Sequence, residues 1–114
     1  MLEFWTTQQD VVIVSNVKAV ELFNHRVIVA ENAFAEIVAW KVAQPVPGSR
    51  HGYKYRLALV VDGRCILRYD NEAGKGDHKH VGEREQPYIF LTIEQLVADF
   101  FQDVMRWHNE NGNA

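Results

Sequence analysis

The stretch YKYRLALVVDGRCILRYDN, residues 53–71, decides the fold. Apolar and polar residues alternate on both sides of Asp62-Gly63, which is typical of two strands that each bury one face. Asp-Gly between such runs indicates a tight hairpin turn, because both residues tolerate a positive φ. We therefore expect a β-hairpin with strands over residues 53–61 and 64–71.

The register of this hairpin depends on the length of its loop. A three-residue loop over residues 61–63, with Gly63 in the left-handed conformation, gives both strands one apolar face. The facing pairs are then Leu57 with Leu67, Tyr55 with Tyr69, and Arg56 with Arg68. Two facing arginines destabilise the sheet unless an anion lies between them. Neutralisation by Asp70 and Glu72 is the open alternative.

Outward from the hairpin, shorter patterns predict the remaining elements. A helical turn is expected over residues 17–23, capped by Asn16. Pro45, Pro47 and Gly48 indicate an exposed loop over residues 44–52. A second loop is expected over residues 73–82, with an extended piece around residues 78–80. Further strands are expected over residues 11–15, 25–30, 34–42 and 88–91, with a turn at residues 31–33.

A single amphipathic helix is expected near the C-terminal end. Thr92 is suited to the N-cap, Gln95 to the second half of a capping box, and Gly112 ends the pattern. Apolar residues recur at helical spacing and are expected in the core: Ile93, Leu96, Val97, Phe100, Phe101, Val104 and Met105. The residues expected to face water are Glu94, Asp99, Gln102 and Asp103.

Together these elements predict an α+β fold, with an antiparallel sheet of four or five strands and a C-terminal helix packed on one face. The 114 residues are the size of one domain, residues 1–114, with a flexible extension over residues 1–10 and a frayed tail over residues 110–114. Apolar residues make up 47% of the chain and charged residues 24%, as in folded globular proteins.

The cellular setting is predicted from the cysteine content and the apolar runs. A single cysteine, Cys65, cannot form an internal disulfide and favours the cytoplasm; we expect it to be a small buried side chain. No apolar run is long enough to cross a membrane, so no membrane partner is expected.

The net charge of −3 is distributed unevenly. Residues 50–84 hold eight of the twelve basic residues, five acidic residues and three of the five histidines. A local positive field can attract an anionic partner in spite of the overall charge. We therefore expect the functional site to lie in this segment.

Histidine transfers protons near neutral pH, and lysine and arginine bind phosphate. Metal-free RNA cleavage needs both, and no cofactor. We predict His78, His80, His51 and Tyr53 as catalytic candidates. The candidates for substrate binding are Lys54, Arg56, Arg68, Lys75, Asn71 and Lys79. A metal site built from His51, Asp77, His78 and His80 is an alternative, which Lys75 and Lys79 disfavour because they repel a cation.

The segments 45–57, 68–80, 87–90 and 94–100 together resemble the TumE family of bacterial toxins. They contain PVPGSRHGYKYRL, RYDNEAGKGDHKH, PYIF and EQLVADF, and the resemblance runs from about residue 25 to residue 106. It implies a toxin whose partners are a helix-turn-helix antitoxin and RNA. The residues that match the polar motif of the family are His51, Tyr53, Lys54, Tyr55, Arg56, Tyr69, Asp70, Asn71, Glu72, Lys75, Gly76, Asp77, His78 and His80.

Three functions remain open from the sequence. The first is a metal-independent ribonuclease toxin of a type II pair, with His78 and His80 as the acid–base groups. The second is a non-enzymatic toxin that binds a host nucleic acid or protein through the same basic surface. The third is a metal-dependent phosphotransfer enzyme. Exposed edge strands favour docking of the antitoxin or a homodimer by strand addition.

Overall fold

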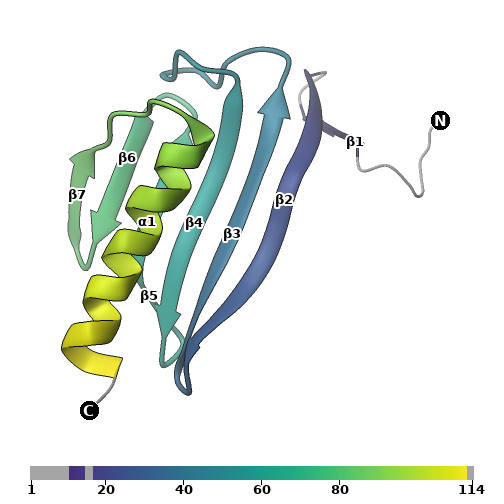
Figure 1. Cartoon of the computed structure of the whole chain (residues 1–114). Coiled ribbons are helices and arrows are strands. Elements are labelled where there is room, and N and C mark those ends of the chain that lie inside the picture. The colour runs from purple at the N-terminus through teal and green to yellow at the C-terminus, as the bar shows by residue number, and fades with distance from the viewer. Residues whose placement is uncertain (1–10, 15–16, 113–114) are drawn as a thin grey trace.

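Seven strands form one antiparallel sheet in the computed structural model, which describes residues 11–14 and 17–112. Every strand pairs with its neighbours in the sequence. The strands are β1 (Val11–Val14), β2 (Val17–Ala30), β3 (Ala33–Val42), β4 (Tyr53–Val61), β5 (Arg64–Glu72), β6 (Gly76–Val81) and β7 (Arg84–Pro87). Then come α1 (Ile93–Trp107) and a π-helical turn, η1 (His108–Gly112). Figure 1 shows α1 across one face of the sheet, so the α+β prediction is confirmed, with more strands than expected.

The extra sheet comes partly from the N-terminal part of the chain. The helical turn predicted over residues 17–23 is wrong, because these residues form the first half of β2. Two of them, Val17 and Val20, are β-branched and favour a strand, and the ladder with β3 supplies hydrogen bonds that an isolated turn lacks. A register shift between Glu21 and Phe23 marks a β-bulge in this long strand. Asn16 and the predicted extension over residues 1–10 lie outside the described residues.

The hairpin of β4 and β5 is confirmed, but its predicted register is wrong. Its loop is the two residues Asp62 and Gly63, at φ 51° and 79°. The extra residue lies instead within β5, between the pairs Leu59–Leu67 and Val60–Cys65. The predicted pairs are therefore each displaced: Leu57 faces Tyr69, Arg56 faces Asp70, and Ala58 faces Arg68. No arginine faces another in this hairpin, so no anion is needed there to relieve repulsion between Arg56 and Arg68.

This bulge also changes the position of Cys65. The prediction of a buried side chain is wrong, because Cys65 is exposed. It pairs with Val60, on the face opposite the buried Leu59 and Leu67.

The region after β5 contains more sheet than the sequence indicated. Most of the loop predicted over residues 73–82 is strand β6. The strand predicted over residues 88–91 is wrong, because β7 precedes it and these residues form the connection to α1. Polar residues 84–87 gave no strand signal, and they pair with β6 only because the turn at Gly82 folds the chain back.

The loop before β4 is held against the start of β6 by close backbone contact. Gly48 and Gly76 have φ of 97° and 77°, and a Cβ atom on Gly76 would lie 2.8 Å from the Gly48 carbonyl oxygen. The amide of Gly74 also donates to the Pro47 carbonyl oxygen at 2.7 Å. These glycines therefore bring the loop over residues 44–52 beside the turn that begins β6.

Helix α1 begins as the sequence predicts, with the Thr92 hydroxyl accepting from the Gln95 amide at 3.0 Å. The Gln95 side chain donates to Asp99 rather than back to the cap. Two assignments along the helix are wrong. Met105, expected in the core, is 51% exposed, and Asp103, expected to face water, accepts a hydrogen bond from Tyr69 at 2.5 Å. In the part of the chain that the structure describes, no helix has the length and hydropathy to span a membrane.

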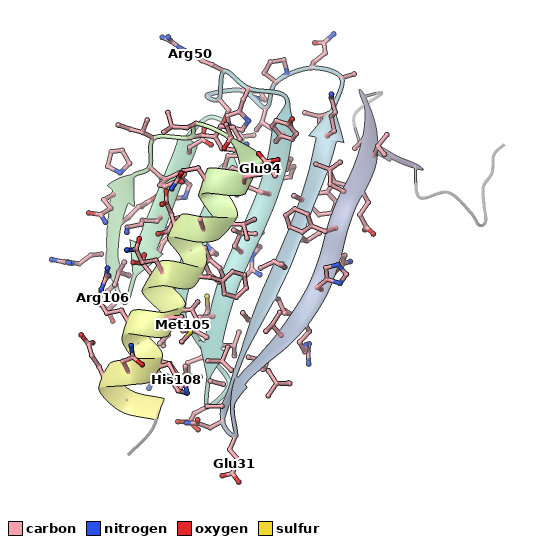
Figure 2. The ribbon with its side chains drawn as sticks, in the orientation of Figure 1. Glu31, Arg50, Glu94, Met105, Arg106 and His108 are labelled. Carbon is pink, nitrogen blue, oxygen red and sulfur yellow. The ribbon has the colours of Figure 1, made fainter. Side chains whose placement is uncertain are left out.

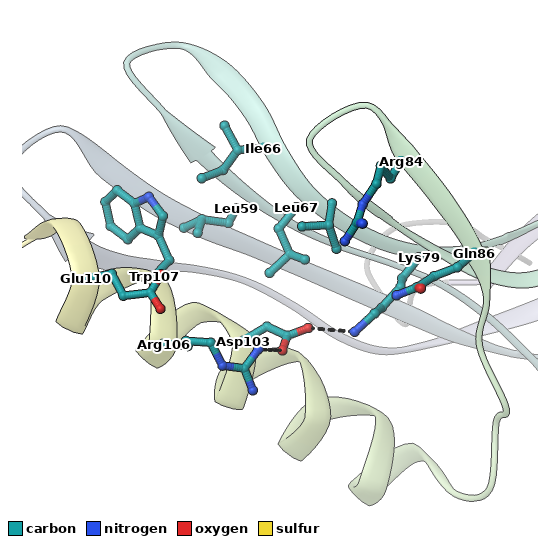
Figure 3. A pocket seen from close by; sticks show the side chains of 11 residues that line it. Leu59, Ile66, Leu67, Lys79, Arg84, Gln86, Asp103, Arg106, Trp107 and Glu110 are labelled. Atoms are coloured by element: carbon teal, nitrogen blue, oxygen red, sulfur yellow. Dashed lines mark hydrogen bonds and ion pairs between the residues drawn. The ribbon is translucent and has the colours of Figure 1, made fainter.

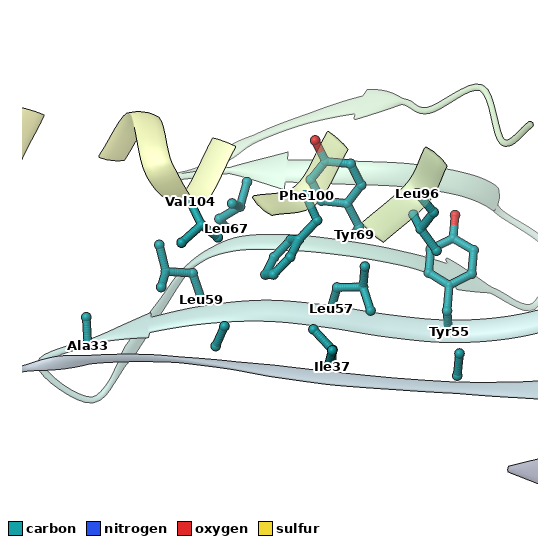
Figure 4. Close-up of a cluster of buried hydrophobic side chains, with 12 residues drawn as sticks. Ala33, Ile37, Tyr55, Leu57, Leu59, Leu67, Tyr69, Leu96, Phe100 and Val104 are labelled. Atoms are coloured by element: carbon teal, nitrogen blue, oxygen red, sulfur yellow. The ribbon is translucent and has the colours of Figure 1, made fainter. Parts of the chain in front are cut away.

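The core lies between α1 and the middle strands, as Figure 4 shows. Leu96, Phe100 and Val104 supply its helical side. The sheet side uses alternate residues of β3, β4 and β5: Ala33, Ala35, Ile37, Ala39, Tyr55, Leu57, Leu59, Leu67 and Tyr69. Since side chains alternate along a strand, the residues between these point to the other face. We call that other side the helix-free face.

Candidate functional site

The alternation along β4, β5 and β6 divides the predicted site residues between the two faces of the sheet. Tyr53, Asn71, Asp77 and Lys79 lie on the same side as α1, and His51 joins Asp77 there. The helix-free face carries Lys54, Arg56, Arg68, His78 and His80. The sequence-predicted metal set is therefore not brought together, because His51 and Asp77 lie on the opposite face from His78 and His80.

On the helix side, Asp77 is the centre of a hydrogen-bonded network. It accepts from Tyr55 Oη at 2.7 Å and from Ser49 Oγ at 2.7 Å, and His51 Nε2 lies 2.6 Å from its Oδ2. Burial and the hydrogen bond to Asp77 raise the pKa of Tyr55 far above its usual range. Tyr55 therefore stays neutral and donates to the carboxylate.

His51 has both ring nitrogens occupied inside the protein. Its Nδ1 accepts from the Tyr53 amide at 3.2 Å, while Nε2 faces Asp77. Its ring stacks on Phe90 with centroids 3.7 Å apart, and Tyr53 lies 5.8 Å from Phe90. This geometry leaves no ring nitrogen free for a substrate, and it favours a role in fixing the loop before β4.

Asn71 is fully buried, and its side-chain contacts are within the protein. Its Oδ1 accepts from the Tyr55 amide at 3.0 Å, and its Nδ2 donates to the Tyr53 carbonyl oxygen at 2.7 Å and to Ser49 Oγ at 3.3 Å. An amide with this many internal partners has little capacity left for a substrate. Asn71 is therefore placed to join β5 to the loop and β4.

Lys79 holds α1 to the sheet. Its Nζ donates to Asp103 Oδ2 at 3.1 Å and to Tyr69 Oη at 3.3 Å. Burial opposes the charge of Asp103, but the bonds from Tyr69 and Lys79 lower its pKa below the usual value. Burial and the bond to Asp103 raise the pKa of Tyr69 far above its usual range.

A cleft lies beside this contact, between the C-terminal half of α1 and strands β4 to β7 (Figure 3). Leu59, Leu67 and Trp107 line its apolar part, with Arg84 and Arg106 among its polar residues. Lys79 is the sequence-predicted site residue that lines it. The cleft is separate from the histidines of the helix-free face.

The helix-free face brings four polar side chains from three strands together: Asp70, His78, His80 and Glu85. We call them the imidazole–carboxylate cluster. Asp70 pairs with His78 across β5 and β6, and His80 pairs with Glu85 across β6 and β7. The Nε2 atom of His78 lies 2.8 Å from Asp70 Oδ1 and 3.3 Å from Glu85 Oε2, and His80 Nε2 lies 3.5 Å from the same glutamate oxygen.

The cluster is partly covered. The side chain of His78 is 5% exposed, whereas those of His80 and Glu85 are 23% and 42% exposed. The two imidazole rings are 4.9 Å apart. His80 is thus the histidine of the cluster that a substrate reaches first.

Some of the basic side chains beside the cluster form ion pairs with its carboxylates, and others do not. Arg68 Nε lies 3.0 Å from Asp70 Oδ2, and Lys75 Nζ lies 3.9 Å from Glu85 Oε2. Lys54 and Arg56 are exposed, and neither forms an ion pair with a described residue. Arg56 faces Asp70 directly across β4 and β5. It is therefore the free cation nearest to the cluster along this row of the sheet.

Sequence reasoning missed two members of the cluster. Asp70 is among the residues that match the polar motif of the family, but its contact with His78 depends on the register of β5 and β6. Glu85 lies in a polar segment without a strand signal, and it joins only because β7 folds back on β6. His78 and His80 are two residues apart, and residues at this spacing on a strand point to the same face.

The family comparison supports the resemblance in the sequence. The family model for toxin TumE matches residues 2–108, which is nearly the whole chain. Searches of curated proteins and of solved structures found no match. Because the family model covers far more than half of the sequence, the chain belongs to the TumE family of toxins.

Proposed function

We propose that this toxin acts on RNA, which it binds across the helix-free face and cleaves at the imidazole–carboxylate cluster. The observation that carries the proposal is the row Val38, Arg56, Asp70 and His78, which runs across four adjacent strands on one open face. An exposed cation for a phosphate thus lies beside a pair of proton-transfer groups.

The same face supplies a surface for an unpaired base. Trp40 is half-buried on β3 and faces Lys54 on β4. Open sheets with aromatic and basic side chains bind single-stranded RNA by stacking and phosphate contacts. Trp40, Lys54 and Arg56 therefore favour a single-stranded segment as the ligand.

For cleavage, we assign the first proton transfer to His80. Its Nε2 takes the proton of the 2′-hydroxyl, and the 2′-oxygen attacks the neighbouring phosphorus. Arg56 stabilises the negative charge that develops on the phosphate oxygens. The imidazolium that this transfer forms on His80 then gives its proton to the leaving 5′-oxygen, so no proton is gained or lost overall. His78, which is nearly buried, positions His80 and Glu85.

An RNA cleavage assay in the presence of a chelator tests this chemistry. Purified wild-type protein and a His80→Ala variant are each incubated with a single-stranded RNA. Wild type is expected to cleave the RNA, and the variant to lose activity by at least about a hundredfold. A Glu83→Gln variant in the exposed turn before β7 is the control for fold and handling. Full activity in His80→Ala, or cleavage that requires a metal, contradicts the mechanism.

Binding is tested separately by charge reversal. Arg56→Glu is expected to weaken RNA binding and to abolish growth arrest on induced expression in a host. Arg64→Glu is the matched control, because Arg64 is also exposed but pairs with Val61, on the helix side of the sheet. If both variants lose RNA binding and growth arrest equally, the effect is one of overall charge and not of a specific binding face.

A toxin that binds without cleaving is a second candidate function. It is favoured by the internal contacts of the histidines, since His51, His78 and His80 each lie near a carboxylate. In that case Arg56→Glu relieves growth arrest, whereas His80→Ala still arrests growth and total RNA stays intact. For either candidate we propose an antitoxin as the neutralising partner, in keeping with the toxin family.

A further inference from the structure

We infer that the imidazole–carboxylate cluster is a binding site for a divalent transition metal such as Zn²⁺. One ligand atom each from Asp70, His78 and His80 lies within 4.8 Å of the other two. Glu85 adds a carboxylate oxygen next to both imidazoles. Two imidazole nitrogens with carboxylate oxygens form a donor set that suits zinc and neighbouring metals.

The hydrogen bonding of His78 points to a ligand. Its Nδ1 lies 3.0 Å from the Gly76 carbonyl oxygen, and a carbonyl can only accept, so Nδ1 carries the proton. In the neutral ring, Nε2 then presents a lone pair toward the Asp70 carboxylate. Metal-bound histidines almost always donate the other ring N–H to a carboxylate, a backbone carbonyl or water, and the Gly76 carbonyl is such an acceptor.

Three buried atoms of the cluster lack hydrogen-bond partners: Asp70 Oδ1, His78 Nε2 and His80 Nε2. Asp70 Oδ1 and His78 Nε2 are 2.8 Å apart without a hydrogen bond between them. Buried polar atoms without partners are costly, so a cation that all of them contact would stabilise this arrangement. His78 itself is 4% exposed, which places the unpartnered atoms inside the protein.

The distances between donor atoms are close to those of a tetrahedral site. Zinc bonds of about 2.0 Å imply about 3.3 Å between neighbouring ligand atoms. The Nε2 atoms of His78 and His80 lie 3.3 Å and 3.5 Å from Glu85 Oε2. Asp70 Oδ1 lies 2.8 Å from His78 Nε2, which is shorter than this spacing, so Asp70 would have to turn slightly away from His78 to share a metal with it.

The local charge also permits a cation. Two carboxylates contribute two negative charges. Arg68 lies near Asp70 Oδ2, the oxygen that does not contact His78. The Lys75 side chain is 56% exposed, and its Nζ lies 3.9 Å from Glu85 Oε2, the oxygen next to both imidazoles. Lys79, which was predicted to repel a metal, points to the helix side and contacts Asp103. One of the two lysines thought to repel a metal is therefore on the far side of the sheet.

A bound metal has a consequence for the proposed ribonuclease, and this step rests on that function. The metal occupies the Nε2 lone pair of His80, which the metal-free reaction needs as its base. Metal binding and acid–base cleavage are therefore mutually exclusive, and Zn²⁺ is expected to inhibit the toxin.

Titration of the purified full chain, without a histidine tag, tests the site. Co²⁺ is the probe, because tetrahedral Co²⁺ has strong visible absorption, and competition with Zn²⁺ then gives the zinc affinity. We expect saturation at one Co²⁺ per chain, and an affinity at least about tenfold weaker in His80→Ala. Glu85→Gln is a second ligand variant in case His80→Ala is unfolded by circular dichroism.

The control variant is His25→Asn, which removes an exposed histidine on β2. It should bind Co²⁺ as wild type does. Non-saturable Co²⁺ binding by wild type, or undiminished affinity in both ligand variants, overturns the inference.

The RNA assay separates this inference from the proposed function. Cleavage in chelator that Zn²⁺ suppresses supports both. Cleavage by a protein without saturable Co²⁺ binding overturns the metal site alone. Saturable binding by a protein that cleaves RNA only with metal, or never, keeps the site and overturns the metal-free reaction.

Discussion

Asn71 provides a sharp test because sequence and structure suggest different roles for it. From the sequence, Asn71 is predicted to bind substrate. In the structure its fully buried amide bonds to Tyr55, Tyr53 and Ser49. Replacement of Asn71 by alanine should therefore change the stability of the fold before it changes any contact with RNA.

The size of the effect follows from the three hydrogen bonds. Each contributes about 1 kcal/mol net, and a buried backbone group left without a partner costs about 1–3 kcal/mol. In Asn71→Ala the Tyr55 amide and the Tyr53 carbonyl lose this partner, both at the start of β4. We expect the free energy of unfolding to fall by about 2–4 kcal/mol, which lowers the melting temperature of a domain this size by roughly 10–20 °C.

Urea unfolding followed by far-ultraviolet circular dichroism measures this change. Asn24→Ala is the matched control, since Asn24 is an exposed asparagine in β2 and its loss should cost less than about 0.5 kcal/mol. If Asn71→Ala loses less than about 1 kcal/mol but binds RNA weakly, the structural role is refuted and the substrate-binding role stands.

Three further predictions concern the buried face of α1, the glycine that begins β6, and the ion pair that joins α1 to β6. Val104→Ala should lower the free energy of unfolding by about 1–3 kcal/mol, whereas Met105→Ala should change it by less than about 0.5 kcal/mol, because only Val104 is buried; thermal melts of both decide this. Gly76→Ala should destabilise by more than Gly63→Ala in urea titrations, since both glycines have positive φ but only the first would place its Cβ 2.8 Å from a backbone oxygen. The Asp103 pKa is lowered by folding, so its stabilisation is complete above the ordinary value of 3.8 and is lost as the pH falls through the lower folded value. The stability advantage of wild type over Asp103→Asn should accordingly be constant near neutral pH and shrink below about pH 4.

Much of the fold was predictable from local patterns. The hairpin of β4 and β5, strand β3 and the start of α1 each have a periodic signal with a clear turn or cap. The register of the hairpin was not predictable in detail. One extra residue between the paired positions is needed to keep the apolar side chains of both strands on one face. The sequence does not tell whether this residue lies in the loop or forms a bulge within β5.

The candidate site was predictable only in part. Neighbouring residues on a strand point to opposite faces, so the separation of Asp77 from His78 follows once β6 is known to be a strand. The three glycines from residue 74 to residue 82 and their neighbours instead favoured a loop. Glu85 depends on the pairing of β7, which arises from tertiary contact and not from local preference.

Figure 2 shows how the ends of the sheet differ, with Arg50 at one end and Glu31 at the other. Arg50 lies in the loop over residues 44–52, which is hydrogen-bonded to the turn before β6 through the Gly74 amide and the Pro47 carbonyl oxygen.

The nearest-neighbour order of the sheet has a consequence for synthesis of the protein. Each strand can form its ladder as soon as the next one is made, without waiting for distant segments, and such local contacts favour fast folding. Helix α1, however, follows all seven strands in the chain. Until residues 93–107 leave the ribosome, Leu57, Leu59 and Tyr69 remain uncovered, and the nascent sheet is at its most prone to aggregation.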